Sequence, residues 1–299
     1  YFLKTLEISK DDSYKYKDID IHYTYLWLGD LYKLSDDSKK AEYYYLLSLK
    51  NIDSIKNEED KEIIKLNIYY TLGRFYTDQS LYDKGLDNAQ NALKITLDLY
   101  DIKDKNHLKT LDLIGEIYIE KRLYSKAEEY ILKSYNIKDK YYENSDISLN
   151  KSLLDLGEIY FAQGLYNKSE QALLSALQNL ENYYGENHFN LGSTLIYLGD
   201  LYSELGSFEK AEKFYLKALL IDEKYYGENS IKLSGNLLAL GYINFEIDRY
   251  EKAMQFFKRN LSILESYYGK NHYKTTSTLN WIGDIYEKKK EYKKAEDYH

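Results

Sequence analysis

The sequence contains no proline, no cysteine and only one methionine. Without cysteine there is no disulfide framework and no thiol chemistry, so the redox compartment cannot be read from it. No run of about 18 apolar residues is present, and no segment is therefore predicted to insert into a membrane.

Basic residues are not clustered along the chain. The longest basic run is Lys288–Lys290, and the formal net charge is −8. A nucleic-acid surface requires clustered lysine and arginine, because contacts to phosphates supply most of its affinity. The sequence therefore predicts no nucleic-acid partner.

Tyrosine, by contrast, is abundant, with 37 residues among 299. Several tyrosines recur at a fixed interval, namely Tyr76, Tyr118, Tyr160 and Tyr202. We interpret most of them as products of a biased composition that serve in the core. The alternative is a tyrosine-rich recognition surface, because tyrosine combines an apolar ring with a polar tip.

The stretch 191–227 shows the unit that the rest of the chain repeats. Its first half has apolar residues at alternating spacings of four and three, which predicts one face of an α-helix. These residues are Leu191, Leu195, Leu198, Tyr202 and Leu205. Gly206-Ser207 then breaks the pattern, and a second helical stripe begins at Phe208. Gly227 is expected to end this second helix as a left-handed residue, and Asn229 or Ser230 to cap the next one.

A glycine recurs in the first half of every unit. The series is Gly29, Gly73, Gly115, Gly157, Gly199, Gly241 and Gly283, with steps of 42 residues after a first step of 44. From the second unit onward an aromatic residue follows nine positions after the glycine, and in all units a small residue follows after twelve. A fixed period of this size predicts a solenoid of stacked supersecondary units.

The recurring Leu-Gly-x-x-Tyr, followed by an aromatic residue and Ala-Glu-x-x-Tyr/Phe-x-x-Ala, resembles the tetratricopeptide repeat (TPR). The longer period and the Tyr-Tyr-Gly-x-Asn-His turns at 183–188 and 267–272 are similar to the repeats of kinesin light chains. The resemblance covers essentially the whole chain. It implies an all-α fold, an α-solenoid in which helix-turn-helix repeats wind into a right-handed superhelix. The proline that commonly ends the second helix is absent, and Gly185, Gly227 and Gly269 are expected to take its place.

We expect six full repeats with a partial repeat at each end, all in one continuous solenoid. The predicted units are 1–21 (a second helix of a truncated repeat plus a connector), 22–65, 66–107, 108–149, 150–191, 192–233, 234–275 and 276–299 (a truncated seventh repeat). The charged connector 51–62 is two residues longer than the others and is expected to be the most mobile point. Because both ends fall within a repeat, we expect the chain to be part of a longer protein.

No catalytic, metal or cofactor site is predicted. His188 and His272 occupy equivalent turns 84 residues apart, so we assign them to helix starts. Glu296 and His299 have the spacing of a Glu-x-x-His ligand pair, but no second ligand set lies nearby. No nucleophile–base pair and no phosphate-binding loop after a strand is present. We therefore expect a protein that is not an enzyme and that binds no cofactor and no metal.

The resemblance to TPR proteins places the first helix of each repeat on the concave face. On that helix, positions three before and one, four and five after the glycine lie away from the core stripe. The residues predicted to line the groove are Leu26, Asp30, Tyr70, Arg74, Asp112, Glu116, Ile119, Leu154, Glu158, Phe161, Ile196, Asp200, Glu204, Leu238, Tyr242, Phe245, Asn280 and Asp284.

This predicted groove has an apolar floor and acidic flanks. The position after the glycine is acidic in five of seven repeats, and the position three before it is mostly apolar. We therefore expect a protein or peptide partner, extended or helical, that presents apolar and basic residues. The alternative is that these carboxylates are a solvated face that pairs with neighbouring lysines.

The sequence thus favours a protein-interaction scaffold or adaptor, with cytoplasmic location as the expectation. A first alternative is the regulatory sensor arm of a larger effector protein whose catalytic domain lies outside this chain. A further alternative is a structural rod that self-associates through its uncapped ends.

Overall fold

The computed structural model describes residues 17–142 and 147–299, and every regular element within these ranges is a helix. Residues 1–16 of the predicted segment 1–21, which include its expected helix, lie outside the described residues. The α-helices are α2 (Lys17–Leu34), α3 (Ser38–Lys50), α4 (Glu58–Asp78), α5 (Tyr82–Leu99), α6 (Lys105–Glu120), α7 (Tyr124–Tyr141), α8 (Ser148–Ala162), α9 (Tyr166–Tyr184), α10 (Gly192–Glu204), α11 (Phe208–Tyr226), α12 (Ser234–Glu246), α13 (Tyr250–Tyr268), α14 (Thr276–Lys288) and α15 (Tyr292–Tyr298). Short 3₁₀ turns are η1 (Ile52–Ser54), η2 (Phe189–Leu191), η3 (Ile231–Leu233) and η4 (Tyr273–Thr275). None of the described helices combines the length and apolar character that crossing a membrane requires.

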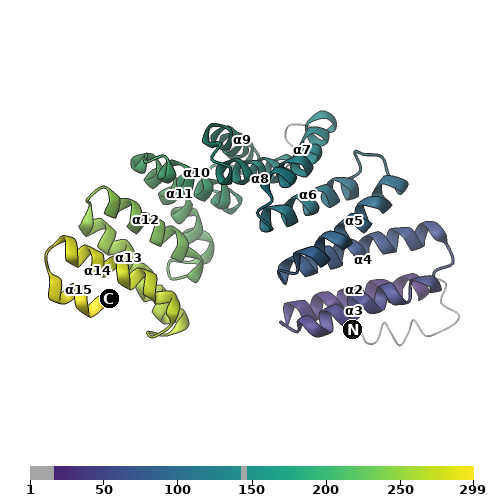
Figure 1. The fold of residues 1–299 in the computed structure, drawn as a ribbon, viewed down its shortest axis with the longest axis horizontal. Coiled ribbons are helices and arrows are strands. Elements are labelled where there is room, and N and C mark those ends of the chain that lie inside the picture. Colours follow the sequence, from purple (N-terminus) through teal and green to yellow (C-terminus); the bar gives the residue numbers. More distant parts are fainter. Residues whose placement is uncertain (1–16, 143–146) are drawn as a thin grey trace. The chain divides into compact units, whose positions relative to one another are not determined.

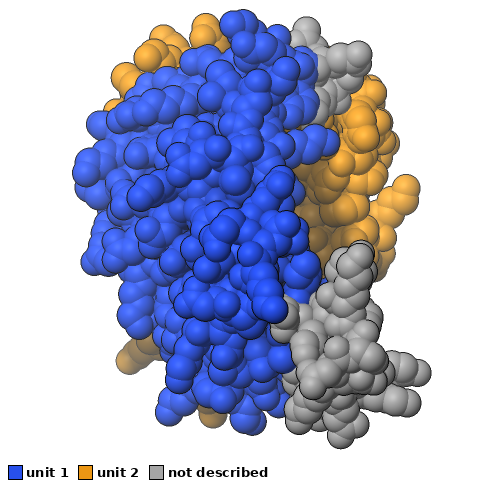
Figure 2. Space-filling model, turned by 90° about the vertical axis from the view of Figure 1, so that its right-hand side faces the viewer, with its two compact units in different colours: residues 1–143 blue, residues 144–299 orange. Residues whose placement is uncertain are grey.

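The chain forms two compact units, residues 1–143 and residues 144–299 (Figure 2). In the first unit the pairs α2–α3, α4–α5 and α6–α7 each fold back as a helical hairpin (Figure 1). In the second unit the pairs are α8–α9, α10–α11, α12–α13 and α14–α15. The second helix of each pair also packs on the first helix of the next pair within its unit. Each unit is therefore an all-α solenoid of stacked helix pairs, which confirms the predicted fold class, whereas the repeat boundaries stay a prediction.

The predicted core stripe is buried, with one exception. Leu191, Leu195, Leu198 and Tyr202 are at most 7% exposed, whereas Leu205 is 45% exposed. Leu205 is the C-cap of α10, where the chain leaves the helix axis. The helical period therefore identified the core correctly up to the last residue of the stripe.

Six of the seven repeat glycines allow a bulky side chain of the second helix to lie against the first helix, and the exception is Gly73, where the corresponding residue is Ala89. The contacting residue stands 16 positions later on the second helix, as in Gly29 with Tyr45 and Gly199 with Tyr215. A Cβ atom on Gly199 would lie 2.6 Å from the Tyr215 ring. The 42-residue glycine period is thus a close-approach requirement between paired helices.

The turn between the helices of each pair uses a left-handed backbone conformation seven residues after the repeat glycine. Glycine occupies this position only at Gly164 and Gly206. The other five residues also have φ between 56° and 61°, namely Asp36, Ser80, Arg122, Asp248 and Lys290. Aspartate adopts this region more readily than arginine or lysine does. Because Arg122 and Lys290 adopt it here as well, the packing of the paired helices, and not glycine alone, determines the turn conformation.

The ends of the longer second helices follow the prediction in part. Gly185, Gly227 and Gly269 are the C-caps of α9, α11 and α13, and all have positive φ. For Gly227, however, φ is 89° and ψ is 151°, which is a glycine-specific extended region and not the left-handed helical region that we expected. Downstream, the side chains of His188, Ser230 and His272 accept hydrogen bonds as N-caps of η2, η3 and η4, which confirms their helix-start role.

The connector between the first two full repeats is anchored in the core. Ile52 and Ile55 are 7% and 4% exposed, and both belong to the apolar cluster of the first unit. The high charge of this stretch obscured these two anchors. α4 begins at Glu58, with the side chain of Asn57 as its N-cap.

The recurring tyrosines of the first helices have a structural role. In six pairs a lysine ammonium lies over the ring of the tyrosine three residues after the glycine, as Lys84 lies 4.9 Å from the Tyr76 ring centroid. The hydroxyl of Tyr76 also donates to Glu42 in the preceding pair, at 2.8 Å. Each such cation–π contact contributes about 0.5–1 kcal/mol at an exposed site. These contacts support the structural interpretation of this tyrosine series.

The stability of the first unit is expected to decrease at low pH because of His107. This side chain is 5% exposed, and burial lowers its pKa below the ordinary value of 6.5. The unfolded chain therefore takes up a proton more readily, so stability is fully present above about pH 6.5 and is lost as pH falls below it. Urea denaturation between pH 5 and 8 should show a flatter pH dependence for His107→Gln. An unchanged slope in this variant would contradict the assignment.

Candidate protein-binding surface

All eighteen predicted groove residues lie on the first helices of the pairs. These helices are α2, α4 and α6 in the first unit and α8, α10, α12 and α14 in the second. Leu26 is buried in the apolar cluster of the first unit, so it is not available to a partner. Asp30, Arg74, Glu204 and Asn280 are exposed, and the remaining thirteen residues are half-buried.

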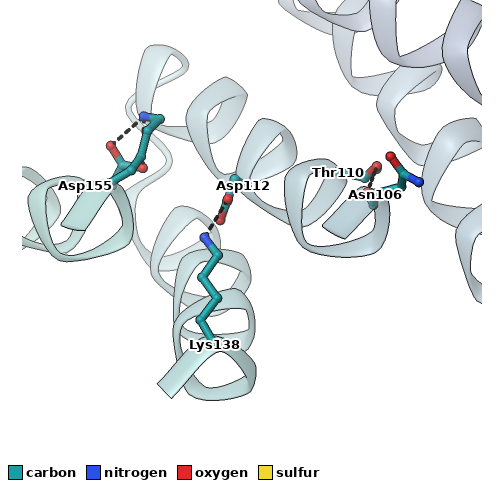
Figure 3. A network of polar contacts seen from close by, with 6 residues as sticks. Asn106, Thr110, Asp112, Lys138 and Asp155 are labelled. Atoms are coloured by element: carbon teal, nitrogen blue, oxygen red, sulfur yellow. Dashed lines mark hydrogen bonds and ion pairs between the residues drawn. The ribbon is translucent and has the colours of Figure 1, made fainter. Parts of the chain in front are cut away.

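In the first unit, two of the predicted carboxylates already have partners within the chain. The Tyr45 hydroxyl donates to Oδ1 of Asp30 at 2.7 Å. Nζ of Lys138 lies 2.7 Å from Oδ2 of Asp112, and Figure 3 shows the lysine side chain extending from its helix toward that carboxylate. The side chain of Lys138 is only 3% exposed. Asp112 therefore serves an internal ion pair.

The first unit has two surface hollows near its predicted residues. One, of about 170 Å³, is lined mainly by polar side chains and includes Tyr70. The other, of about 430 Å³, is an open apolar surface on α2 formed by Trp27, Asp30, Leu31 and Leu34. Neither hollow joins residues from more than two helix pairs.

In the second unit, the structure brings five predicted residues together around one hollow of about 450 Å³. They are Phe161 of α8, Asp200 and Glu204 of α10, and Leu238 and Tyr242 of α12. Trp281 of α14 completes the lining, together with Ser203, Tyr215, Gly235 and Ala239. Four successive first helices thus contribute to one concave site.

Trp281 forms the aromatic wall of this hollow and was not among the predicted residues. Its ring centroid lies 5.5 Å from that of Tyr242 and 5.3 Å from that of Phe245. Phe257 lies parallel to the indole, at 6.0 Å and an interplanar angle of 4°. The side chain stands two residues before Gly283, a position that the selected helix face omitted.

The carboxylates of the second unit accept hydrogen bonds from tyrosine hydroxyls. Tyr215 donates to Oδ1 of Asp200 at 2.5 Å, and Tyr197 donates to Oε2 of Glu158 at 2.7 Å. Tyr166 donates a longer hydrogen bond of 3.4 Å to Oε1 of Glu204. A tyrosine hydroxyl donates one hydrogen bond to a carboxylate and brings no positive charge, so these contacts are hydrogen bonds and not ion pairs.

Burial changes the pKa values of two side chains that line the hollow. Burial raises the pKa of Asp200 above its ordinary value, and the hydrogen bond from Tyr215 partly offsets this increase. Burial also raises the pKa of Tyr242, and the negative charges of Glu246 and Glu204 add to the effect. Both shifts show that these side chains are partly desolvated, so a negative charge on either one is less stable here than in water.

Charge is distributed unevenly between the two helix layers of the second unit. The second helices α9, α11, α13 and α15 carry ten basic and ten acidic residues. Ion pairs link neighbouring second helices, such as Lys217 with Glu181 and Arg259 with Glu223. The first helices α8, α10, α12 and α14 carry seven carboxylates but only two lysines.

Neither of the two lysines on these first helices compensates the negative charge of the hollow. Lys151 pairs with Asp155 at 3.0 Å, and Lys288 is the last residue of α14. Within the described ranges, no lysine or arginine forms an ion pair with Asp200 or Glu204. The alternative in which the acidic flanks pair with neighbouring lysines therefore applies to Asp112 but not to this hollow.

Other predicted residues lie beside the hollow and do not line it. Phe245 supports Trp281, and Leu154 and Ile196 pack on the core cluster of the second unit. Glu158, Asn280 and Asp284 also lie on the first helices without contributing to the lining.

Asp284 belongs instead to a small cluster at the end of α14. Possible ligand atoms of Asp284, Glu287 and His299 lie within 4.8 Å of one another. The sequence gives Glu296 and His299 only a chance Glu-x-x-His spacing, and in the structure the ring of His299 packs on Gly283 and faces Asp284. Glu287 and His299 are exposed, and exposed acidic groups of this kind are common without a metal, so we assign no metal to them.

Comparison with known families gives one match. The tetratricopeptide repeat family model matches residues 148–224 and 232–299. No curated protein matches this chain.

Solved structures of repeat proteins are similar in fold. The TPR-like repeats of a Podosopora anserina kinesin light chain are 14% identical, with a TM-score of 0.59 over 68% of this chain and 95% of that chain. A Rap protein complexed with competence and sporulation factor is 15% identical, with a TM-score of 0.63 over 99% of this chain and 93% of that one. A Pyrococcus horikoshii signal-transduction ATPase with a tetratricopeptide repeat sensor is 16% identical, with a TM-score of 0.66 over 99% of this chain but only 44% of that one.

Proposed function

We propose, on the premise that this chain is a tetratricopeptide-repeat protein, that it is a scaffold whose second unit binds a basic, partly apolar segment of another protein. The binding surface is the hollow lined by α8, α10, α12 and α14. No catalytic role is part of this proposal.

The observation that supports this proposal most is the uncompensated charge of the first helices. The first helices of the second unit carry seven carboxylates and two lysines, and two of these carboxylates, Asp200 and Glu204, line the apolar hollow, whereas the second helices are balanced. A carboxylate beside an apolar wall is poorly solvated, so a cation delivered by a partner gains more than it would at an open surface. Balanced charge on the second helices offers no such preference to a partner.

The form of the hollow favours a protein segment over a small molecule. It is open and extends over four helices, and its lining includes Phe161, Leu238 and Trp281. A peptide or helix that presents alternate apolar and basic side chains fits such a surface, because the rigid helices are already in place. The Rap protein that was solved with competence and sporulation factor, and that shares this fold, is consistent with such a role.

Site-specific photocrosslinking in native lysate tests the proposal. A benzoylphenylalanine placed at Ala239 in the hollow is expected to crosslink a partner, whereas one at Leu220, 66% exposed on α11, should not. Glu204→Lys should abolish the crosslink from position 239, and about 0.5 M salt should weaken it because the charges are partly exposed. Glu209→Lys on α11 is the matched charge control and should retain it. Crosslinks that form from position 220 and persist with Glu204→Lys would place recognition on the second helices.

One alternative has a specific observation in its favour. The Pyrococcus horikoshii protein is a signal-transduction ATPase that carries a tetratricopeptide repeat sensor, and this chain matches 44% of its length. A sensor arm of a larger effector would use the same hollow for its signal. The gene sequence on both sides of the present chain distinguishes the two roles, since an attached effector domain would favour the sensor arm.

A further inference from the structure

We infer that the hollow of the second unit is a pocket for an arginine side chain of the partner. The inference rests on the proposed function and specifies the chemistry of its anchor. Trp281 and Tyr242 would receive the planar guanidinium group, and Asp200 and Glu204 would accept its hydrogen bonds.

The aromatic side of the pocket is suited to a cation. Tryptophan is the strongest cation–π partner among the side chains, and Trp281 lines the hollow together with Tyr242. Phe257 packs parallel to one side of the indole and fixes its plane. A fixed aromatic plane reduces the ordering entropy that binding would otherwise cost.

The acidic side of the pocket is arranged for two hydrogen bonds. Asp200 and Glu204 are four residues apart on α10, so both side chains project from the same face of this helix. The Tyr215 hydroxyl occupies Oδ1 of Asp200, and the Tyr166 hydroxyl lies 3.4 Å from Oε1 of Glu204. Each carboxylate thus keeps an oxygen for which the described residues supply no partner.

Arginine fits this combination better than lysine does. Its guanidinium is planar, carries five N–H donors and is more weakly hydrated than an ammonium group, so it can stack on an aromatic ring and donate to carboxylates simultaneously. A hard metal ion would prefer an all-oxygen site without an aromatic wall. An acidic ligand would be repelled by the two carboxylates.

The tryptophan content allows a direct test on the full chain. Only two tryptophans are present, so Trp27→Phe leaves Trp281 as the single emission reporter. The probe is a capped peptide of four Arg-Leu-Ala units, compared with peptides in which lysine or citrulline replaces arginine. Citrulline keeps the shape of arginine but removes the charge.

The arginine peptide is expected to change Trp281 emission saturably and to bind at least tenfold more tightly than the lysine peptide, with no response to the citrulline peptide. Glu204→Gln should weaken arginine-peptide binding about tenfold, whereas Glu209→Gln on α11 should not change it. Equal affinity for the lysine and arginine peptides, or no saturable response to either, would overturn the arginine pocket. Such a result would not contradict the proposed scaffold role, because the crosslinking at position 239 tests that role without depending on arginine.

Discussion

Replacing Lys138 by alanine is expected to destabilise the first unit by about 3–5 kcal/mol, because it leaves a buried carboxylate without its cation. Nζ of Lys138 lies 2.7 Å from Oδ2 of Asp112, and the two side chains are 3% and 15% exposed. Oδ1 of Asp112 is buried without a hydrogen-bond partner among the described residues. No other observed contact of this carboxylate can therefore replace the lost ion pair.

Hydrogen exchange of the full chain would measure this loss where it occurs. In a solenoid, stability is a sum of repeat and nearest-neighbour terms, so the effect should concentrate on α6 and α7. Exchange in α12 and α13 of the other unit should remain unchanged and serves as the internal control. A loss of less than about 1 kcal/mol in α6 and α7 would show that water reaches Asp112 and that the pair behaves like a surface salt bridge.

A double variant separates the charge from the packing. Asp112→Leu combined with Lys138→Met removes both charges and retains apolar volume, so most of the lost stability should return. If the double variant is as unstable as Lys138→Ala, the aliphatic stem of the lysine and not its charge would be responsible. The outcome bears on function, because a structural Asp112 cannot also serve as a site for a partner.

The helical period and the glycine series predicted much of the fold because they report on local geometry. Leu195, Leu198 and Gly199 identified both the buried face and the close approach of the paired helices. The apolar anchors of the first connector were missed, because Ile52 and Ile55 stand singly among charged residues. A single apolar residue in a polar stretch has no period to identify it.

The candidate site was predicted on the correct helices, but its chemistry depends on residues distant in the sequence. Asp200 and Asp112 look equivalent as acidic groups of first helices. Asp112 receives Lys138 from α7, whereas the one partner of Asp200 among the described residues is the Tyr215 hydroxyl from α11. The difference lies in the residue that the second helix places opposite the carboxylate. Sequence spacing along the first helix cannot show which acidic groups remain available.

The same substitution at two positions of α12 is expected to have opposite effects. Gly241→Ala should destabilise the second unit by about 2 kcal/mol, because its Cβ would lie 2.3 Å from the ring of the fully buried Phe257. Gly235→Ala should stabilise it by roughly 0.5 kcal/mol, because no atom lies within 4 Å of that Cβ and alanine favours the helix.

Displacement of the Phe257 ring should also change the surroundings of Trp281 in the binding hollow, since this ring lies parallel to Trp281. In the Trp27→Phe background, Gly241→Ala is therefore expected to shift the emission of Trp281, and Gly235→Ala to leave it unchanged. Urea denaturation followed by this emission measures both quantities in one experiment. If both variants gain stability, the glycine period would reflect only helix propensity and not the close packing of the two helices. If Gly241→Ala loses stability without a shift in emission, the Phe257 ring would have moved away from Trp281 and the wall of the hollow would be independent of the core.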